Sequence, residues 1–291
     1  MPNRMTDQEM ANEIWYWYLN GGNSAGFPTF LRLQMTALSG AFRLLPGKPR
    51  CIQCNAPLSG FGAAVVKPFG YGASVLTPKL CNSCEKVIFS AEGGAEVELT
   101  LLFADIRGST SMAEQQGALE YRNFIQRFYK ATSGTLIEHN ALVNRLAGDQ
   151  AIGLFVPRFA GANHAAVALQ AAADILRLTG HADPQGPWAP VGIGVHTDTA
   201  YVGVVGSKGG VNEIAVLGNA ANLTARLSSA AAAGELLVSE QAAALANLPR
   251  EGLERRSLSL KGISKPVPVR VVTLAAPAPG MSGTIASDTK P

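Results

Sequence analysis

Two aspartates stand where a buried strand is expected to meet a turn. Asp105 ends the apolar run of the segment LLFADIRGST, and Asp149 lies in the Gly-Asp turn of LAGDQAIGLF. A carboxylate is costly to bury unless a cation or a hydrogen-bond donor compensates it. Two carboxylates brought together would hold a hard divalent cation such as Mg²⁺ or Mn²⁺, which prefers oxygen ligands. Taken alone, Asp149 is also a common turn residue.

Four cysteines form a second candidate site, in two Cys-x-x-Cys pairs: Cys51 with Cys54, and Cys81 with Cys84. Tetrahedral sulfur ligation suits Zn²⁺ or an iron–sulfur cluster. The pairs are further apart than the roughly 15–20 residues of a common zinc pattern, which indicates a knuckle with an irregular insert. Disulfides are disfavoured in a reducing compartment. We expect one Zn²⁺ per chain, with an iron–sulfur cluster as the alternative.

The residues that follow Asp105 suit an anion. Ile106 to Thr110 supply backbone N–H groups at a turn and a helix N-terminus, where a phosphate binds favourably. Capping of the helix by Ser109 or Thr110 is the alternative interpretation, but it leaves Asp105 unexplained. A metal ion beside a phosphate cradle implies a nucleoside triphosphate as ligand.

Composition limits the classes of function. The chain has 291 residues, of which 47% are apolar and 15% charged, and a net charge of +3. Lys and Arg are scattered and form no basic run, which disfavours a nucleic-acid partner. No apolar stretch reaches the roughly 18 residues of a membrane span, and the start lacks a signal-peptide pattern. We expect a cytoplasmic protein without a transmembrane segment, and peripheral membrane association stays open.

The order of expected elements predicts an α+β fold. From residue 95, strands alternate with helices in the order β-α-β-β-α-β, with extra strands, which is the ferredoxin-like arrangement. The first strand then neighbours the hairpin that carries Asp149, so the two aspartates converge. We expect PVGIGVHTDTAYVGVVGS to form two strands around a turn at Asp198, and His196 to be a structural residue. The helix NAANLTARLSSAA places Asn222 and Arg226 on one face.

Four regions are expected along the chain: helices in 1–50, the cysteine module in 51–94, the α+β domain in 95–274 and a disordered tail in 275–291. Before the cysteines, apolar residues follow spacings of four and three. Two interpretations of this seam are open, a dimer contact or a helix lying on the core of its own chain. The seam comprises Leu31, Met35, Leu38, Phe42 and Leu45.

Five motifs, in this order and spacing, resemble the catalytic domain of class III adenylate and guanylate cyclases. They are LLFADIRGST, LAGDQAIGLF, GIGVHTDTAYVGVVGS, VLGNAANLTARLSSAA and LKGISKPVPV, between about residues 95 and 274. The resemblance implies conversion of ATP to 3′,5′-cyclic AMP and pyrophosphate by two Mg²⁺ or Mn²⁺ ions at a homodimer interface.

The resemblance also implies a role for each matching residue. Asp105, Asp149 and the Ile106 carbonyl match the ligands of the metal pair. Asn222 and Arg226 match the residues that orient the ribose and stabilise the reacting phosphorus, and in the family they face the aspartates of the other subunit. The phosphates would lie at Gly108, Ser109, Thr110 and Lys261.

Two positions depart from the family pattern. Where adenylate cyclases commonly read the purine with Lys and with Asp or Thr, this chain has Arg145 and Ala215. Arg145 can donate a hydrogen bond to adenine or guanine, but Ala215 cannot accept one from the adenine amino group. ATP is the favoured substrate, with GTP or mixed specificity as alternatives. A catalytically silent nucleotide-binding module is a further alternative, although the retained metal ligands argue against it.

Overall fold

The computed structural model describes residues 5–21, 29–74, 77–206, 212–249 and 251–274. The part of the tail expected to be disordered, 275–291, lies outside these residues. In chain order the elements are α1 (Asp7–Asn20), α2 (Thr29–Arg43), α3 (Gly60–Val66), the 3₁₀ helix η1 (Lys67–Phe69), α4 (Asn82–Ser90), β1 (Gly94–Ile106), α5 (Ser109–Gln115), α6 (Ala118–Glu138), β2 (Leu142–Ala147), β3 (Gln150–Phe155), α7 (Pro157–Ala160), α8 (His164–Leu178), β4 (Val191–Gly206), β5 (Asn212–Leu217), α9 (Asn219–Ala230), β6 (Glu235–Ser239), α10 (Glu240–Leu245), β7 (Glu254–Leu258) and β8 (Val267–Thr273).

One mixed sheet organises the α+β domain. Its strand order is β2-β3-β1-β4-β6-β8-β7, and β5 pairs with β4. β4 and β6 run parallel, whereas β1 pairs antiparallel with both β3 and β4. The β-α-β-β-α-β order expected from the sequence is therefore confirmed, and it places β1 next to the β2–β3 hairpin.

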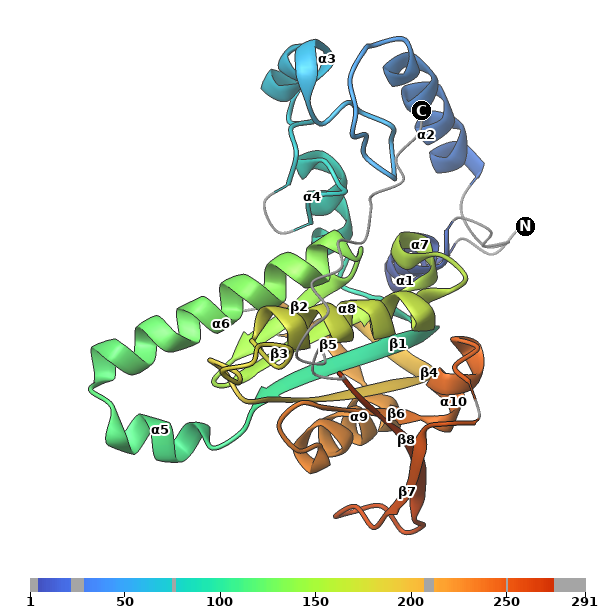
Figure 1. Cartoon of the computed structure of the whole chain (residues 1–291). Coiled ribbons are helices and arrows are strands. Elements are labelled where there is room, and N and C mark those ends of the chain that lie inside the picture. The colour runs from blue at the N-terminus through green and yellow to red at the C-terminus, as the bar shows by residue number, and fades with distance from the viewer. Residues whose placement is uncertain (1–4, 22–28, 75–76, 207–211, 250, 275–291) are drawn as a thin grey trace.

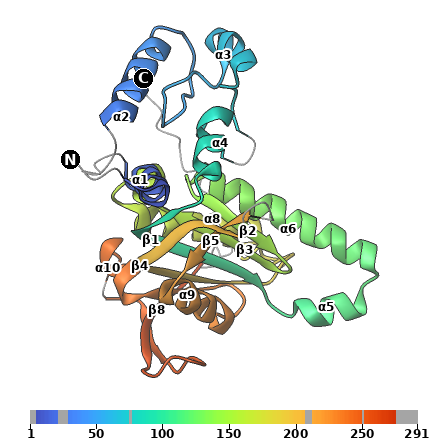
Figure 2. The ribbon, with the colours of Figure 1, turned by 180° about the vertical axis from the view of Figure 1, so that it is seen from behind.

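Alternate residues of β1 face two different cores. Leu102, Ala104 and Ile106 pack with apolar residues of α6 and α8, while Leu99 and Leu101 pack with α1 and the cysteine module. This alternation is the period-2 pattern of a strand that is buried on both faces. The two views show α6 and α8 over one face of the sheet and α9 over the other (Figures 1 and 2).

The helix α9 lies unusually close to β4. A Cβ atom added at Gly194 would come within 2.4 Å of the backbone nitrogen of Ser228, and one at Gly192 would meet the carbonyl oxygen of Ala231 at 2.7 Å. The GIG sequence of β4 is thus required for the helix to approach the strand. As a result α9 is held against the sheet over its last two turns.

The expected turn at Asp198 is wrong. Residues 191–206 form one continuous strand, β4, and Asp198 pairs with Leu99 of β1 inside it. The polar residues are satisfied within the strand, because the Thr197 hydroxyl bonds that of Thr100 at 2.7 Å and Asp198 Oδ1 accepts from its neighbouring N–H at 2.8 Å. The turn-forming residues are accommodated because β1 pairs with β4 on both sides of Asp198, from Val191 to Gly203.

The N-terminal helices and the cysteine module lie against one end of the sheet (Figure 1). The indole nitrogen of Trp15 in α1 donates to the Ala91 carbonyl at 2.9 Å, and the Tyr18 and Phe159 rings meet edge to face at 5.2 Å. In α2, Met35 and Leu38 pack on the same core as the cysteines. This favours a helix lying on its own chain over a dimer seam, although the Leu31 side chain is outside the described part.

Among the described residues, no helix is both long and apolar enough to cross a membrane.

Candidate functional site

The fold brings Asp105 and Asp149 together at one end of the sheet. Asp105 pairs with Gln150 across β1 and β3, so it lies beside the hairpin tip that carries Asp149. The N–H of Ile106 donates to the Asp149 carbonyl at 3.1 Å. Both carboxylates are partly buried. The convergence predicted from the sequence is therefore present in the structure.

The electrostatics of Asp105 suit a cation. Burial raises the pKa of Asp105, the Arg107 guanidinium lowers it, and the neighbouring Asp149 raises it, with a net upward shift. Arg107 forms an ion pair with the Asp105 carboxylate and donates to the Ser229 carbonyl of α9 at 2.9 Å. A divalent ion between the carboxylates would oppose the upward shift, because a nearby positive charge favours the ionised form.

The turn after Asp105 is built around Gly108. Its φ of 72° is in the left-handed region, which glycine adopts without strain. The next residue, Ser109, is buried and its hydroxyl bonds the Asp149 carboxylate, whereas Thr110 is exposed. Ser109 therefore orients a carboxylate, in addition to the phosphate role expected for it.

The hairpin tip is fixed by α6. The Tyr129 hydroxyl donates to the carbonyl of Gly148 at 2.7 Å, and Gly148 has a φ of 62°. Burial raises the pKa of Tyr129, and the charge of Asp149 raises it further, so the phenol stays a donor. Tyr129 thus positions Asp149 through the backbone of Gly148, a role that no sequence pattern indicated.

Three other predicted residues lie apart from the aspartates in a single chain. Asn222 and Arg226 are exposed on α9, on the side away from the sheet, and Lys261 is exposed in the loop between β7 and β8. Within the described residues, no hydrogen bond or ion pair joins these side chains to Asp105 or Asp149. In the described part of a single chain, Asn222, Arg226 and Lys261 therefore lie apart from both carboxylates.

An apolar cavity of about 650 Å³ lies between α1, through Trp15 and Tyr18, and the strands that carry the predicted purine positions. Arg145 is in β2 and Ala215 in β5, and both strands line the cavity, through Leu146 and Ile214 among others. The Arg145 side chain is outside the described part of the chain, so its direction is not assigned. The cavity volume is in the range of small-molecule sites.

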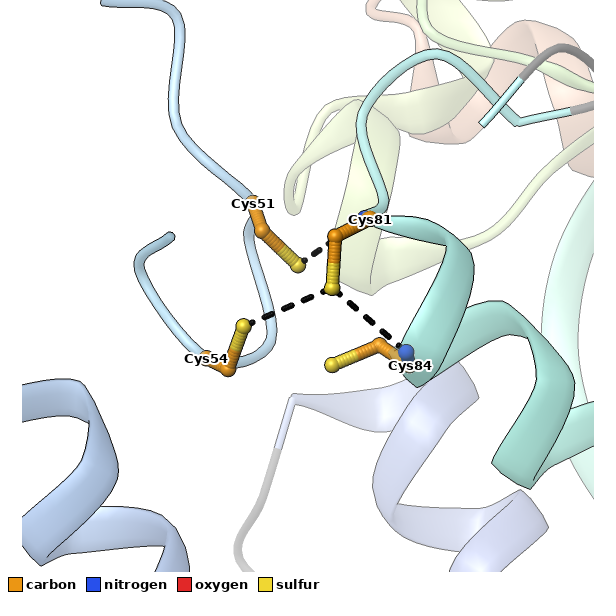
Figure 3. A group of neighbouring side chains, drawn as sticks. All are labelled: Cys51, Cys54, Cys81 and Cys84. Atoms are coloured by element: carbon orange, nitrogen blue, oxygen red, sulfur yellow. Dashed lines mark hydrogen bonds between the residues drawn. The ribbon is translucent and has the colours of Figure 1, made fainter. Parts of the chain in front are cut away.

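The four cysteines converge in a second site, shown in Figure 3. Their sulfur atoms all lie within 4.8 Å of one another, and those of Cys54 and Cys81 are 3.6 Å apart. Two backbone groups point at sulfur: Cys81 N–H donates to Cys51 at 3.3 Å, and Cys84 N–H to Cys81 at 3.5 Å. All four side chains are buried and none forms a disulfide.

This geometry fits a metal ion. Sulfur atoms bound to zinc at about 2.3 Å in a tetrahedron are roughly 3.8 Å apart, close to the spacing seen here. Hydrogen bonds within the cluster, from Cys54 first, lower the pKa of Cys51, which favours a thiolate at that position. The predicted grouping of both Cys-x-x-Cys pairs in one site is therefore present.

His196 has the structural role expected for it. The side chain is 1% exposed, and its Nδ1 is 2.8 Å from the Ser239 hydroxyl. Burial lowers its pKa, which favours the neutral ring. Two arginines of the sites were not predicted: Arg107 at the aspartates, and Arg158, which bonds the Ile52 carbonyl inside the first cysteine pair at 2.6 Å.

Comparison with solved structures places the fold. The guanylyl cyclase Cya2 superposes with a TM-score of 0.55 at 24% identity, over 63% of this chain and 96% of that one. The adenylyl cyclase CyaB from P. aeruginosa gives a TM-score of 0.54 at 25% identity, over 62% and 97%. Both superpositions cover nearly all of the compared chain. One compared protein is named a guanylyl cyclase and the other an adenylyl cyclase.

Curated relatives match over part of their length. An uncharacterized protein of Rhizobium meliloti (strain 1021) is 28% identical over 184 residues, 61% of this chain and 17% of the relative. An adenylate cyclase of Anabaena cylindrica is 31% identical over 135 residues, 44% of this chain and 26% of the relative. The chain spans about a quarter or less of the length of these relatives.

The sequence model of the adenylate and guanylate cyclase catalytic domain matches residues 94–271, from the first residue of β1 into β8. This range contains both aspartates, the helix α9 and the hairpin that carries Lys261, and it leaves the cysteine module outside. The chain therefore belongs to the adenylate and guanylate cyclase catalytic domain family.

Proposed function

We propose that this protein is a nucleotidyl cyclase that converts ATP to 3′,5′-cyclic AMP and pyrophosphate, at two active sites of a homodimer. The observation that carries the proposal is the position of Asp105, at the end of β1, beside the hairpin tip that carries Asp149. Two partly buried carboxylates at one strand end supply the oxygen ligands that Mg²⁺ or Mn²⁺ prefers. When bound, two such ions would lower the pKa of the ribose 3′-hydroxyl and offset the charge of the triphosphate.

The surrounding residues would then hold the substrate. Ser109 keeps the Asp149 carboxylate oriented, and the backbone N–H groups of the Gly108 turn would bind phosphate. An exposed guanidinium such as that of Arg226 can offset the negative charge that grows on the phosphorus oxygens, and Lys261 can bind the terminal phosphates. Because both lie apart from the aspartates in one chain, a second copy would supply them.

GTP is the second candidate substrate. Ala215 offers no side-chain acceptor to the adenine amino group, and the structural neighbours include a guanylyl as well as an adenylyl cyclase. The cavity beside β2 and β5 is mostly apolar, so it would bind either purine ring without selecting its polar edge. We favour ATP on the family resemblance, and we expect weak discrimination.

We also propose that the cysteine cluster holds one zinc ion per chain, with an iron–sulfur cluster as the alternative. The sulfur spacing and the two N–H···S bonds support a tetrathiolate site. One zinc per chain without visible absorbance would support zinc, whereas iron with sulfide and a brown colour would support the cluster.

The test of function is direct. The purified full chain is incubated with ATP or GTP and Mn²⁺, and any cyclic product is identified by mass. The test variant is Asp105→Asn, because it keeps the shape of the side chain and removes its charge. Cyclisation by the wild type and its loss in the variant are expected; cyclisation at the wild-type rate by the variant would contradict a metal role for Asp105.

A further inference from the structure

Arg158 belongs to the cyclase domain, but its guanidinium lies in the cysteine module. It is carried by α7, which directly follows β3. Its Nη2 donates to the carbonyl oxygen of Ile52 at 2.6 Å, and its Nη1 donates to that of Gly21 at 3.5 Å. Ile52 stands between Cys51 and Cys54, so this hydrogen bond reaches the chelating loop itself.

The contact is electrostatic as well as geometric. The guanidinium bonds the residue that follows Cys51, and a negative charge on Cys51 would oppose the lowering of the Arg158 pKa by burial. Four thiolates around one divalent ion have a net charge of about −2, and a buried charge of this size requires compensation. The guanidinium supplies a positive charge at the edge of the cluster.

Lys79 provides a useful contrast. Its carbonyl accepts a hydrogen bond from the Ile52 N–H at 3.0 Å, so it is attached to the same loop as Arg158. Burial lowers the pKa of its side chain. Arg158 thus reaches Ile52 with its side chain, whereas Lys79 contacts Ile52 through its backbone. Arg50 also contacts the loop, by donating to the Asn55 carbonyl just after Cys54 at 2.9 Å.

We propose that Arg158 completes the metal centre of the cysteine module, as the counter-charge of a tetrathiolate zinc site built from Cys51, Cys54, Cys81 and Cys84. The inference rests on the zinc site proposed above and is independent of which nucleotide is cyclised. It makes the module and the cyclase domain share one site, because the ligands come from the module and the compensating charge comes from α7.

Such a shared site links metal binding to the order of α7. Next to Arg158, Phe159 packs edge to face on Tyr18 of α1, so α7 is held by the two hydrogen bonds of Arg158 and by this aromatic contact. Without the ion the buried thiolates take up protons, because several unpaired negative charges are costly to bury together. The attraction between the guanidinium and the cluster is then weakened. The other end of β3 leads to Asp149, so α7 and the candidate active site lie at opposite ends of one strand.

The experiment compares the full-length wild type with Arg158→Met, Arg158→Lys and the matched control Lys79→Met. Zinc affinity is measured by competition with a chromogenic chelator, and hydrogen exchange is measured over residues 156–161 with and without zinc. Loss of an outer partner of a metal site typically weakens binding by roughly 10- to 100-fold. We expect that loss in Arg158→Met, a smaller loss in Arg158→Lys, and less than about a threefold change in Lys79→Met.

Hydrogen exchange distinguishes a counter-charge role from a packing role, because loss of packing alone would not remove the effect of zinc on the exchange rate. In the wild type, zinc is expected to slow exchange over 156–161, and in Arg158→Met this zinc dependence should disappear while the lysine variant restores part of it. Wild-type zinc affinity in Arg158→Met, or equal losses in the Arg158→Met and Lys79→Met variants, would overturn the proposal. A wild-type chain that binds no zinc would also overturn it. Neither measurement uses a nucleotide, so a failure here is distinct from a failure of the cyclase assay.

Discussion

Mixing two inactive variants tests whether each active site is shared between two copies of the chain. Asp105→Asn removes a carboxylate at the end of β1, and Arg226→Ala removes a guanidinium from the exposed side of α9. In a head-to-tail dimer each variant alone has two defective sites. A mixed dimer has one site with both groups intact and one site with neither.

The expected recovery follows from counting. Random pairing of equal amounts gives about half mixed dimers, each with one intact site of two, so activity should reach about a quarter of the wild-type value. Removing a single charge-stabilising group costs on the order of 100-fold or more in rate, which leaves each variant alone at about 1% or less. Mixing should therefore raise activity roughly 25-fold over either variant.

The assay measures cyclic nucleotide by mass after subunit exchange, with mixed dimers counted by native mass spectrometry of differently tagged chains. The matched control mixes Asp105→Asn with Asp149→Asn. Both of these changes affect the same half of the site, so no dimer of that mixture is repaired. If the first mixture also fails to recover, although mixed dimers are present, the site is completed within one chain and the reasoning is refuted.

Three further results are expected. Burial raises the pKa of Asp105 despite Arg107, so protons compete with Mn²⁺ at higher pH than at an ordinary aspartate. The Mn²⁺ concentration at half-saturation should rise by up to about tenfold for each pH unit below that pKa. A Mn²⁺ titration followed by electron spin resonance that shows no pH dependence would contradict this. Combining Ala215→Asp with Arg145→Lys should raise the ratio of ATP to GTP turnover by roughly fivefold, since the new aspartate acceptor contributes about 1 kcal/mol, and an unchanged ratio means that other residues read the base. Cys84→Ser should lower the amount of bound zinc, measured by elemental analysis. It should also lower the melting temperature, because the ion supplies folding free energy to the module. Full zinc occupancy in that variant would exclude Cys84 as a ligand.

Much of the fold could be predicted because its elements are periodic and its turns have typical residues. The hairpin of β2 and β3 follows from the Gly-Asp turn at residues 148–149, and the shared α9 face of Asn222 and Arg226 follows from their spacing of four residues. The strand β4 was predicted as a hairpin because His-Thr-Asp-Thr has turn propensity. A local pattern cannot show that β1 continues opposite Asp198 and Thr199 and pairs with them throughout.

The candidate sites divide in the same way. The aspartates and cysteines were found because their residue types and spacing are unusual for a core. Arg107 and Arg158 were not, since an arginine in a turn or short helix is ordinary and its partner depends on the tertiary fold. The adjacency of Arg107 to Asp105 was the available signal for one of them, whereas Arg158 is 106 residues from Ile52 and no local signal exists.

The pairing of β1 with β4 limits how movement can travel through the molecule. The two strands are in register from Gly94, beside α1, to Ile106, next to Asp105, over about 40 Å. A slip of one residue would turn every side chain to the opposite face and would exchange two different cores. Any displacement at the Gly94 end must therefore reach Asp105 as a tilt or a twist of the whole pair. In a dimer with shared sites, such a tilt changes the angle at which one subunit presents its carboxylates to α9 of the other.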